Sequence, residues 1–194
     1  MLTGTLNSRS INLEEAFKPI LSKIKNKVAL RVGIFENATQ QKGFNEAKAR
    51  GYLYARDKAL QNGTEPPRKP TPQELETSTP DMKYVAQYAY MNEFGTPSIP
   101  SRPFMRNSVR NNKEKWVQTL KKCLERGMDS EDAIYFLGEE MRADIISEIE
   151  TGNFAPNSPL TVEFKKLKGR TEPNRPLIDS GILEKSIDYQ VVKK

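Results

Sequence analysis

A run rich in proline and aromatic residues, Met91–Arg106, most constrains how this chain can fold. Gly95 lies near its start and can adopt a positive φ, so it can end a preceding helix. Three prolines bias the residues before them toward extended backbone: Pro97, Pro100 and Pro103. Three apolar side chains are expected to anchor the run in a core: Phe94, Ile99 and Phe104. Pro103 also suits the first turn of a new helix, so we predict a stiff, extended connector between two helices.

The composition excludes several classes of protein. A length of 194 residues fits one domain, which we predict for 1–194, with 36–82 as an inserted loop or arm. Mean hydropathy of -0.70 indicates a soluble chain, and no apolar run approaches the roughly 20 residues of a spanning helix. The N-terminus lacks the apolar core of a secretory signal. The single Cys123, expected to be buried, excludes an internal disulfide framework and a cysteine-rich zinc site.

The chain contains no histidine, and this argues against most enzymes. Nucleophile pairs of the Ser-His and Cys-His kinds, histidine-ligated metals and histidine-dependent nucleases all need that side chain. There is also no glycine loop of the kind that cradles phosphates. We therefore expect no catalytic residue, no cofactor and no metal site.

Charge is unevenly placed along a chain whose net charge is +6. Eight Lys/Arg and two Asp/Glu give the segment 102–126 a net charge of +6, whereas one Arg and eight Asp/Glu give 127–150 a net charge of −7. Two solvated helix faces would account for this, and so would surfaces of opposite sign that pair between copies or with a partner. Five basic residues are candidates for contact with DNA or with a neighbouring subunit: Arg106, Arg110, Lys113, Lys121 and Lys122.

The first half of the chain predicts a helix, a strand and a long irregular segment. Apolar residues at helical spacing follow Asn12, although Pro19 interrupts that helix. Alternating apolar residues predict a strand over Val28–Phe35. A helix over Asn45–Leu60 is expected to be interrupted by glycine, and five prolines in Glu65–Pro80 predict a loop or an arm without a core element.

The second half predicts three helices and a final strand, so the fold class is α+β with a small antiparallel or mixed sheet packed on two to three helices. Tyr84–Phe94 favours a helix whose apolar face includes Tyr84 and Tyr88, with a strand as the alternative. Pro103–Arg126 predicts a helix with a break at its Asn-Asn pair, followed by an antiparallel helix that begins near Asp129 and ends at Gly152. Thr161–Leu167 favours a helical turn, and Ile187–Val192 favours a strand.

The string most typical of an enzyme is Ile178-Asp-Ser-Gly181. Aspartic proteases carry such a string, but they need two carboxylates that share a proton, and this chain has no second copy. The alternative is that Asp179 or Ser180 caps a short helix that begins at the glycine. Fragments of a nuclease signature, Glu163-Phe-Lys165 and Glu184-Lys185, lie in no convincing strand.

The order of these strings resembles the virion-morphogenesis, or tail-completion (neck), proteins of tailed bacteriophages. The resemblance is carried by Val32-Gly-Ile-Phe35, Asn92-Glu-Phe-Gly-Thr96, Ile99-Pro-Ser-Arg-Pro-Phe-Met-Arg106 and Pro176-Leu-Ile-Asp-Ser-Gly-Ile-Leu-Glu-Lys-Ser-Ile187. It covers roughly residues 10–35 and 83–192, whereas the segment between them is longer and richer in proline than such proteins usually have. Its motif residues are Glu93, Phe94, Gly95, Ile99, Pro100, Arg102, Pro103, Phe104, Leu177, Asp179, Gly181 and Leu183.

The resemblance implies a structural protein without catalytic residues. Such proteins assemble as rings, often hexamers, at the head–tail junction, where they contact other neck, connector, tail-tube or tail-terminator proteins. The implied location is the virion, after assembly in the host cytoplasm, with no membrane partner. A basic lumen would let double-stranded DNA pass without reading its sequence. The alternatives are a basic DNA-binding accessory protein, a tail terminator or head-closure protein of the same virion region, and a hydrolase that uses Asp179.

Overall fold

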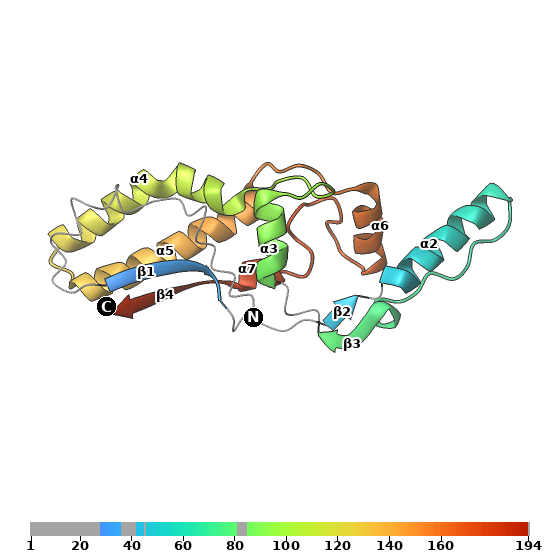
Figure 1. The fold of residues 1–194 in the computed structure, drawn as a ribbon, viewed down its shortest axis with the longest axis horizontal. Coiled ribbons are helices and arrows are strands. Elements are labelled where there is room, and N and C mark those ends of the chain that lie inside the picture. Colours follow the sequence, from blue (N-terminus) through green and yellow to red (C-terminus); the bar gives the residue numbers. More distant parts are fainter. Residues whose placement is uncertain (1–27, 36–41, 45, 81–84, 194) are drawn as a thin grey trace. The chain divides into compact units, whose positions relative to one another are not determined.

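The computed structural model describes residues 28–35, 42–44, 46–80 and 85–193, and it is an α+β protein, as predicted (Figure 1). Its elements form two compact units. The first unit contains Met1–Gly33, Pro103–Gly152 and Ile187–Lys194, and the second contains Ile34–Arg102 and Asn153–Ser186. The predicted helix after Asn12 lies outside the described residues. The division into two compact units does not test the prediction that residues 1–194 form a single domain, which therefore stays a prediction.

Two long helices form the centre of the first unit, α4 (Phe104–Glu125) and α5 (Ser130–Thr151). Gly127 has a φ of 81° in the short turn between them. The Asp129 side chain accepts a hydrogen bond from the Glu131 N–H and so caps the second helix, close to where the sequence predicts that this helix begins. This capping stabilises the start of α5 at the point where the chain reverses.

The predicted break in α4 is wrong, because the helix continues through the Asn-Asn pair. Asn112 is half-buried, and its side-chain amide donates to the Ser108 carbonyl one turn earlier. That bond gives the amide a partner within the helix, so the asparagine does not have to end it.

The two helices run antiparallel, as predicted, and enclose an apolar core. Asn107 bonds to Glu148 and Lys115 bonds to Asp144, so residue numbers rise on one helix as they fall on the other. The buried core residues of the hairpin are Trp116, Leu120, Cys123, Ala133, Ile134, Leu137 and Met141. The apolar side chains that recur at helical spacing along α5 are all buried: Ala133, Ile134, Leu137, Met141, Ile145 and Ile149.

The sheet of the first unit pairs β1 (Val28–Ile34) with β4 (Ile187–Lys193). Both strands were predicted, and both pack against the helical core through half-buried side chains: Leu30, Val32 and Val191. The sheet approaches α5 closely at Gly138, where a Cβ atom would lie 2.4 Å from the Tyr189 ring. A glycine is required there because no larger side chain fits beneath that ring.

In the second unit, α2 (Glu46–Gln61) is continuous through Gly51, so the expected interruption is wrong. Strands β2 (Lys42–Phe44) and β3 (Glu76–Pro80) pair antiparallel, and the 3-10 turn η1 (Gln73–Leu75) precedes β3. A small core forms here from Ala49, Leu53, Leu75, Phe164 and Leu167. The expectation that the proline-rich segment holds no core element is therefore wrong, because Leu75 is fully buried.

The remaining helices of the second unit are α3 (Val85–Phe94), α6 (Pro159–Leu167) and α7 (Ile182–Lys185). Helix rather than strand is confirmed for α3. The placement of Tyr88 on its apolar face is wrong, because Tyr88 is 43% exposed, whereas Val85 on the same predicted face is buried. Tyr84 lies outside the described residues. The buried residues of α3 are Val85, Ala89, Asn92 and Glu93. The predicted turn before Leu167 is a longer helix, since Ser158 caps it.

Across the described ranges, no helix is both long enough and apolar enough to cross a membrane.

Candidate functional site

The connector after α3 is a closed loop, so the prediction of an extended segment is wrong. Gly95 ends the helix with a φ of 76°. Thr96 and Ile99 then exchange backbone hydrogen bonds of 2.8 and 3.3 Å. A Cβ atom on the glycine would lie 3.0 Å from the Ser101 amide nitrogen, so the loop folds back over a position that only glycine fits. The prolines are therefore accommodated in a turn, and they do not make this segment extended.

Arg102 is the centre of the connector, and it is 7% exposed. Its Nε atom donates to the Ala155 carbonyl at 2.8 Å, and Nη2 donates to the Pro156 carbonyl at 2.9 Å. Its Nη1 atom donates to Asn92 Oδ1 at 2.9 Å. Burial lowers the pKa of Arg102, but a guanidinium stays charged. This arginine therefore ties the connector and the end of α3 to the chain that follows Gly152.

Lys165 is a second buried cation, 6% exposed, on α6. Its Nζ atom donates to the carbonyls of Arg175 and Ile178, each at 2.5 Å. Between these acceptors lies Leu177, which is buried and has a φ of 63°. A left-handed backbone is strained for a branched residue and persists only where its surroundings hold it. The lysine therefore holds the strained loop that carries the Pro176–Ile187 string.

Asn157 also binds backbone carbonyls of the same loop. Its side-chain amide donates to the Pro173 carbonyl at 3.1 Å and to the Arg175 carbonyl at 3.0 Å. The Arg175 carbonyl therefore accepts from both the asparagine and Lys165. These bonds satisfy backbone acceptors that no strand or helix pairs.

Asp179 accepts from two cations, and the prediction that it or Ser180 caps a helix is wrong. Lys168 Nζ lies 2.9 Å from one carboxylate oxygen and Arg170 Nε lies 3.0 Å from the other. Gly181 itself is the N-cap of α7, with a φ of 75° and no side-chain cap. Burial acts to raise the pKa of Asp179, but the two cations outweigh it and hold the pKa below its usual range.

This arrangement does not match a hydrolase that uses Asp179. An aspartic protease needs two carboxylates close enough to share a proton, and here the carboxylate lies between two cations. Burial lowers the pKa of Lys165, as it does for catalytic lysines, but its Nζ atom is directed at two backbone carbonyls. In the part of the chain that the structure describes, no three Asp, Glu, His or Cys side chains gather as metal ligands would.

Several motif residues therefore meet in one place, a network that we call the carbonyl clamp: Asn92, Arg102, Asn157, Lys165, Lys168, Arg170 and Asp179. The sequence pattern identified Arg102 and Asp179 but missed the others. Glu93 is buried beside Asn92, and Leu177 and Leu183 are buried in the same unit, whereas Phe94 and Ile99 are only half-buried. Phe104 and Pro103 belong to the first unit, where Phe104 is fully buried and Pro103 precedes α4.

The residues that the pattern missed carry little signal. Asn92 begins the Asn92-Glu-Phe-Gly-Thr96 string, and its place there was the only signal in the sequence that pointed to it. Lys165 is flanked by the buried Phe164 and Leu167, so a polar residue inside an apolar helix face could have flagged it. Its partners are backbone carbonyls, which no side-chain pattern reveals.

The candidate basic residues lie on α4, in the first unit. Arg110, Lys113 and Lys122 are exposed and make no ion pair with the described residues. Lys121 lies 3.7 Å from Glu125, and Arg106 is half-buried. Most of this basic face is therefore available to a partner.

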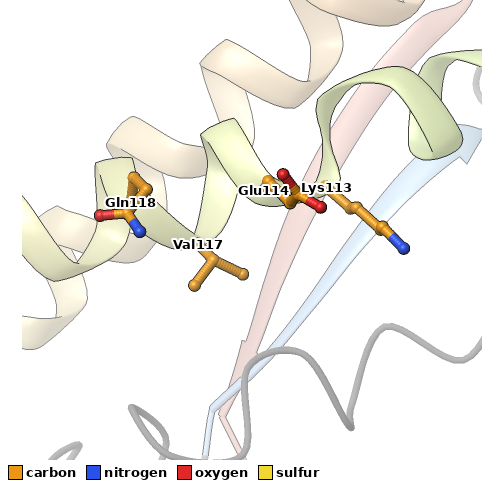
Figure 2. A pocket seen from close by; sticks show the side chains of 4 residues that line it. All are labelled: Lys113, Glu114, Val117 and Gln118. Atoms are coloured by element: carbon orange, nitrogen blue, oxygen red, sulfur yellow. The ribbon is translucent and has the colours of Figure 1, made fainter.

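A hollow of about 470 Å³ opens on the outer side of α4. Its described lining comes from fewer than two turns of one helix: Lys113, Glu114, Val117 and Gln118. Figure 2 shows the Lys113 side chain extended away from the helix. A single apolar side chain gives this hollow no recognisable ligand chemistry.

Comparisons of the chain with models of protein families, with curated proteins and with solved structures found no match.

Proposed function

We propose that this chain is a non-enzymatic subunit of the neck, or tail-completion, region of a tailed-phage virion, where copies of it form a ring that joins tail to head. The ordered strings that resemble such proteins support this proposal. So does the chemistry of the chain, because a protein without histidine, whose Asp179 lies between two cations, has few means of catalysis.

The observation that carries the proposal is the carbonyl clamp. Arg102 and Lys165 direct their donors at four backbone carbonyls, from Ala155, Pro156, Arg175 and Ile178. An enzyme directs such groups into a cavity where a substrate can meet them. Cations committed to backbone acceptors instead fix the relative positions of chain segments, which is what a subunit under mechanical load requires.

The basic face of α4 fits the passage of DNA in such a ring. Lysine and arginine side chains on one helix face attract phosphates without regard to sequence. Arg110 and Lys113 lie on one side of α4 and offer charges that no described carboxylate neutralises, whereas Lys122 lies on the opposite side. We expect this face to line the lumen, with contacts that weaken as salt is raised.

The mass of the assembled protein tests the proposal. Native mass spectrometry should find a closed oligomer, a hexamer by expectation, whose mass is a whole multiple of the 22.1 kDa chain. Negative-stain microscopy should show a ring, and antibody labelling of intact virions should place it between head and tail. A chain that stays monomeric at all concentrations and is absent from purified virions would contradict the proposal. The position of the label would also separate a tail-completion subunit from a tail terminator or a head-closure protein.

A basic DNA-binding accessory protein is the second candidate, and the exposed α4 lysines are the observation that favours it. It predicts binding of duplex DNA by a monomer or dimer, with a strong dependence on salt. Reversing Lys113 and Lys122 to Glu should then abolish a mobility shift. Absence of any shift at low salt would exclude this candidate and leave the ring unaffected.

A further inference from the structure

The distal half of α2 and the segment that follows it pack against no core formed by the described residues. The helix is anchored at its start by Ala49 and Leu53, and at Arg56, which bonds to Glu163 at 2.7 Å. Beyond that point every residue from Leu60 to Lys69 is exposed. The anchor makes this arm, which we define as Tyr54–Lys69, a projection held at one end.

The arm carries large apolar side chains that are mostly exposed in the part of the chain that the structure describes. Tyr54 is 71% exposed and Leu60 is 61% exposed. Lys58 lies one turn after Tyr54 and makes no ion pair with any described residue. An exposed tyrosine on a projecting helix is a feature of interfaces, where aromatic residues are enriched.

An exposed face of opposite charge lies on α5. Phe136 is 53% exposed and Tyr135 is 43% exposed. Asp132 and Glu139 are also exposed, and they lie four residues before and three residues after Phe136, on the same side of the helix. Seven Asp/Glu and one Arg give Ser130–Thr151 a net charge of −6. We call Asp132, Tyr135, Phe136 and Glu139 the acidic aromatic face.

We propose that the arm of one copy docks on the acidic aromatic face of the next copy. Four Lys/Arg and two Asp/Glu give the arm a net charge of +2, opposite in sign to α5. Both surfaces place apolar side chains among their charges, so contact would bury Tyr54 and Leu60 against Phe136. Charge complementarity of this kind selects the partner, and the buried aromatic residues hold it.

The contact joins two different surfaces of identical chains, and such a head-to-tail contact closes into a ring when its rotation allows. The inference rests on the proposed ring, because it names the surfaces that would build it. It also gives a purpose to the segment that departs from the phage family, the proline-rich insert. The prolines stiffen the segment that returns from α2, so less entropy is lost when the arm docks.

Site-directed cross-linking tests the contact directly. Two chains are co-expressed, one with Tyr54→Cys and a mass tag and the other with Phe136→Cys, and a short bis-maleimide is added. Cys123 is buried, so the unmodified chain should give little background. We expect cross-linked pairs that contain one chain of each kind, several-fold above the yield from either chain alone. A chain that carries both changes should give a ladder of covalent multimers.

The matched control replaces Phe136→Cys with Gln118→Cys, an exposed position on α4 that should give background only. All these positions are exposed, so circular dichroism should show an unchanged fold. Mixed yields equal to this control, from a protein that still forms rings, would overturn the arm contact and leave the proposed function intact. A doubly substituted chain that gives only internally cross-linked monomer would also overturn it. A strict monomer without cross-links would overturn the contact and the ring together.

Discussion

Each of the two units of this protein is stabilised internally by a different kind of buried side chain. The first has a continuous apolar core around Trp116 and Leu120, between two long helices and a sheet. The second also buries apolar side chains, around Phe164 and Leu167, but its buried residues include Asn92, Arg102 and Lys165. Apolar burial has no direction and tolerates rearrangement, whereas a buried cation is stable only while its hydrogen bonds are well aligned. Substitutions that leave a cavity should therefore destabilise the first unit most. Substitutions that misalign the hydrogen bonds of buried cations should destabilise the second unit most.

The largest expected effect is on the free energy of unfolding, and it should differ between the two phenylalanines that flank the connector. Phe104 is fully buried in the first unit, so Phe104→Ala should lower the free energy of unfolding by about 3–5 kcal/mol. Phe94 is half-buried in the second unit, with its ring 4.7 Å from that of Tyr90. Phe94→Ala should cost only about 1–2 kcal/mol. Urea unfolding followed by circular dichroism measures both, and equal losses would contradict the difference drawn between the units.

The next effect concerns the geometry of the clamp. Arg102→Ala should lower the free energy of unfolding by about 3 kcal/mol, because it leaves buried acceptors without donors. Arg102→Lys keeps the charge, but an ammonium group cannot reproduce the planar fork that reaches Ala155, Pro156 and Asn92. We therefore expect the lysine variant to recover less than half of the loss.

Arg110→Ala is the matched control for that pair, since Arg110 is exposed on α4 and should change stability by no more than about 0.5 kcal/mol. Full recovery by Arg102→Lys in the same urea titration would show that charge alone matters, and it would refute the role assigned to directed bonds.

This difference also explains what the sequence could predict. The α4–α5 hairpin, its antiparallel course and both strands of the first sheet follow from apolar periodicity and from Gly127 and Asp129, which are local signals. The missed features of the second unit depend on partners far along the chain. Lys165 bonds to carbonyls ten and thirteen residues away, and Arg102 bonds to carbonyls more than fifty residues away.

The loop after α3 shows why local rules misled. Each proline in Pro97–Pro103 favours an extended neighbour, but the paired backbone bonds of Thr96 and Ile99 close the segment into a turn. Gly95 was identified correctly as the helix end, because a positive φ there depends on one residue only. Asp179 was identified as important but assigned the wrong role, since its cations lie nine and eleven residues earlier in the chain.

Two helical glycines provide the next comparison between the units. In the first unit, a Cβ atom on Gly138 would lie 2.4 Å from the Tyr189 ring, so Gly138→Ala should destabilise the fold by about 1–2 kcal/mol. In the second unit, a Cβ atom on Gly51 would meet no atom within 4 Å. Gly51→Ala should stabilise the fold by up to about 1 kcal/mol, because alanine favours helix over the unfolded chain.

Thermal and urea unfolding of the two alanine variants should therefore shift in opposite directions. Combining Gly138→Ala with Tyr189→Ser should remove most of the penalty, since the ring that blocks the new Cβ atom is gone. If Gly138→Ala still destabilises the fold after the Tyr189 ring is removed, the backbone of α5, and not the ring from the sheet, excludes a larger side chain at this position.

The smallest expected effect lies in the charge pair of the clamp. Asp179→Asn should lower the free energy of unfolding at pH 7 by about 1 kcal/mol, because Lys168 and Arg170 keep only a neutral acceptor. The folded-state pKa of Asp179 lies below its unfolded value of about 3.9, so its contribution is present above that pH and is lost as pH falls through the folded pKa. The difference between wild type and Asp179→Asn in urea titrations should therefore stay constant from pH 7 to about 5 and shrink below about 4.

Glu172→Gln, which removes an exposed pair with Arg175, should give no such difference at any pH. A gap between wild type and Asp179→Asn that is the same at pH 3 and pH 7 would mean that the carboxylate acts through its shape and hydrogen bonds, and that its charge contributes nothing to the clamp.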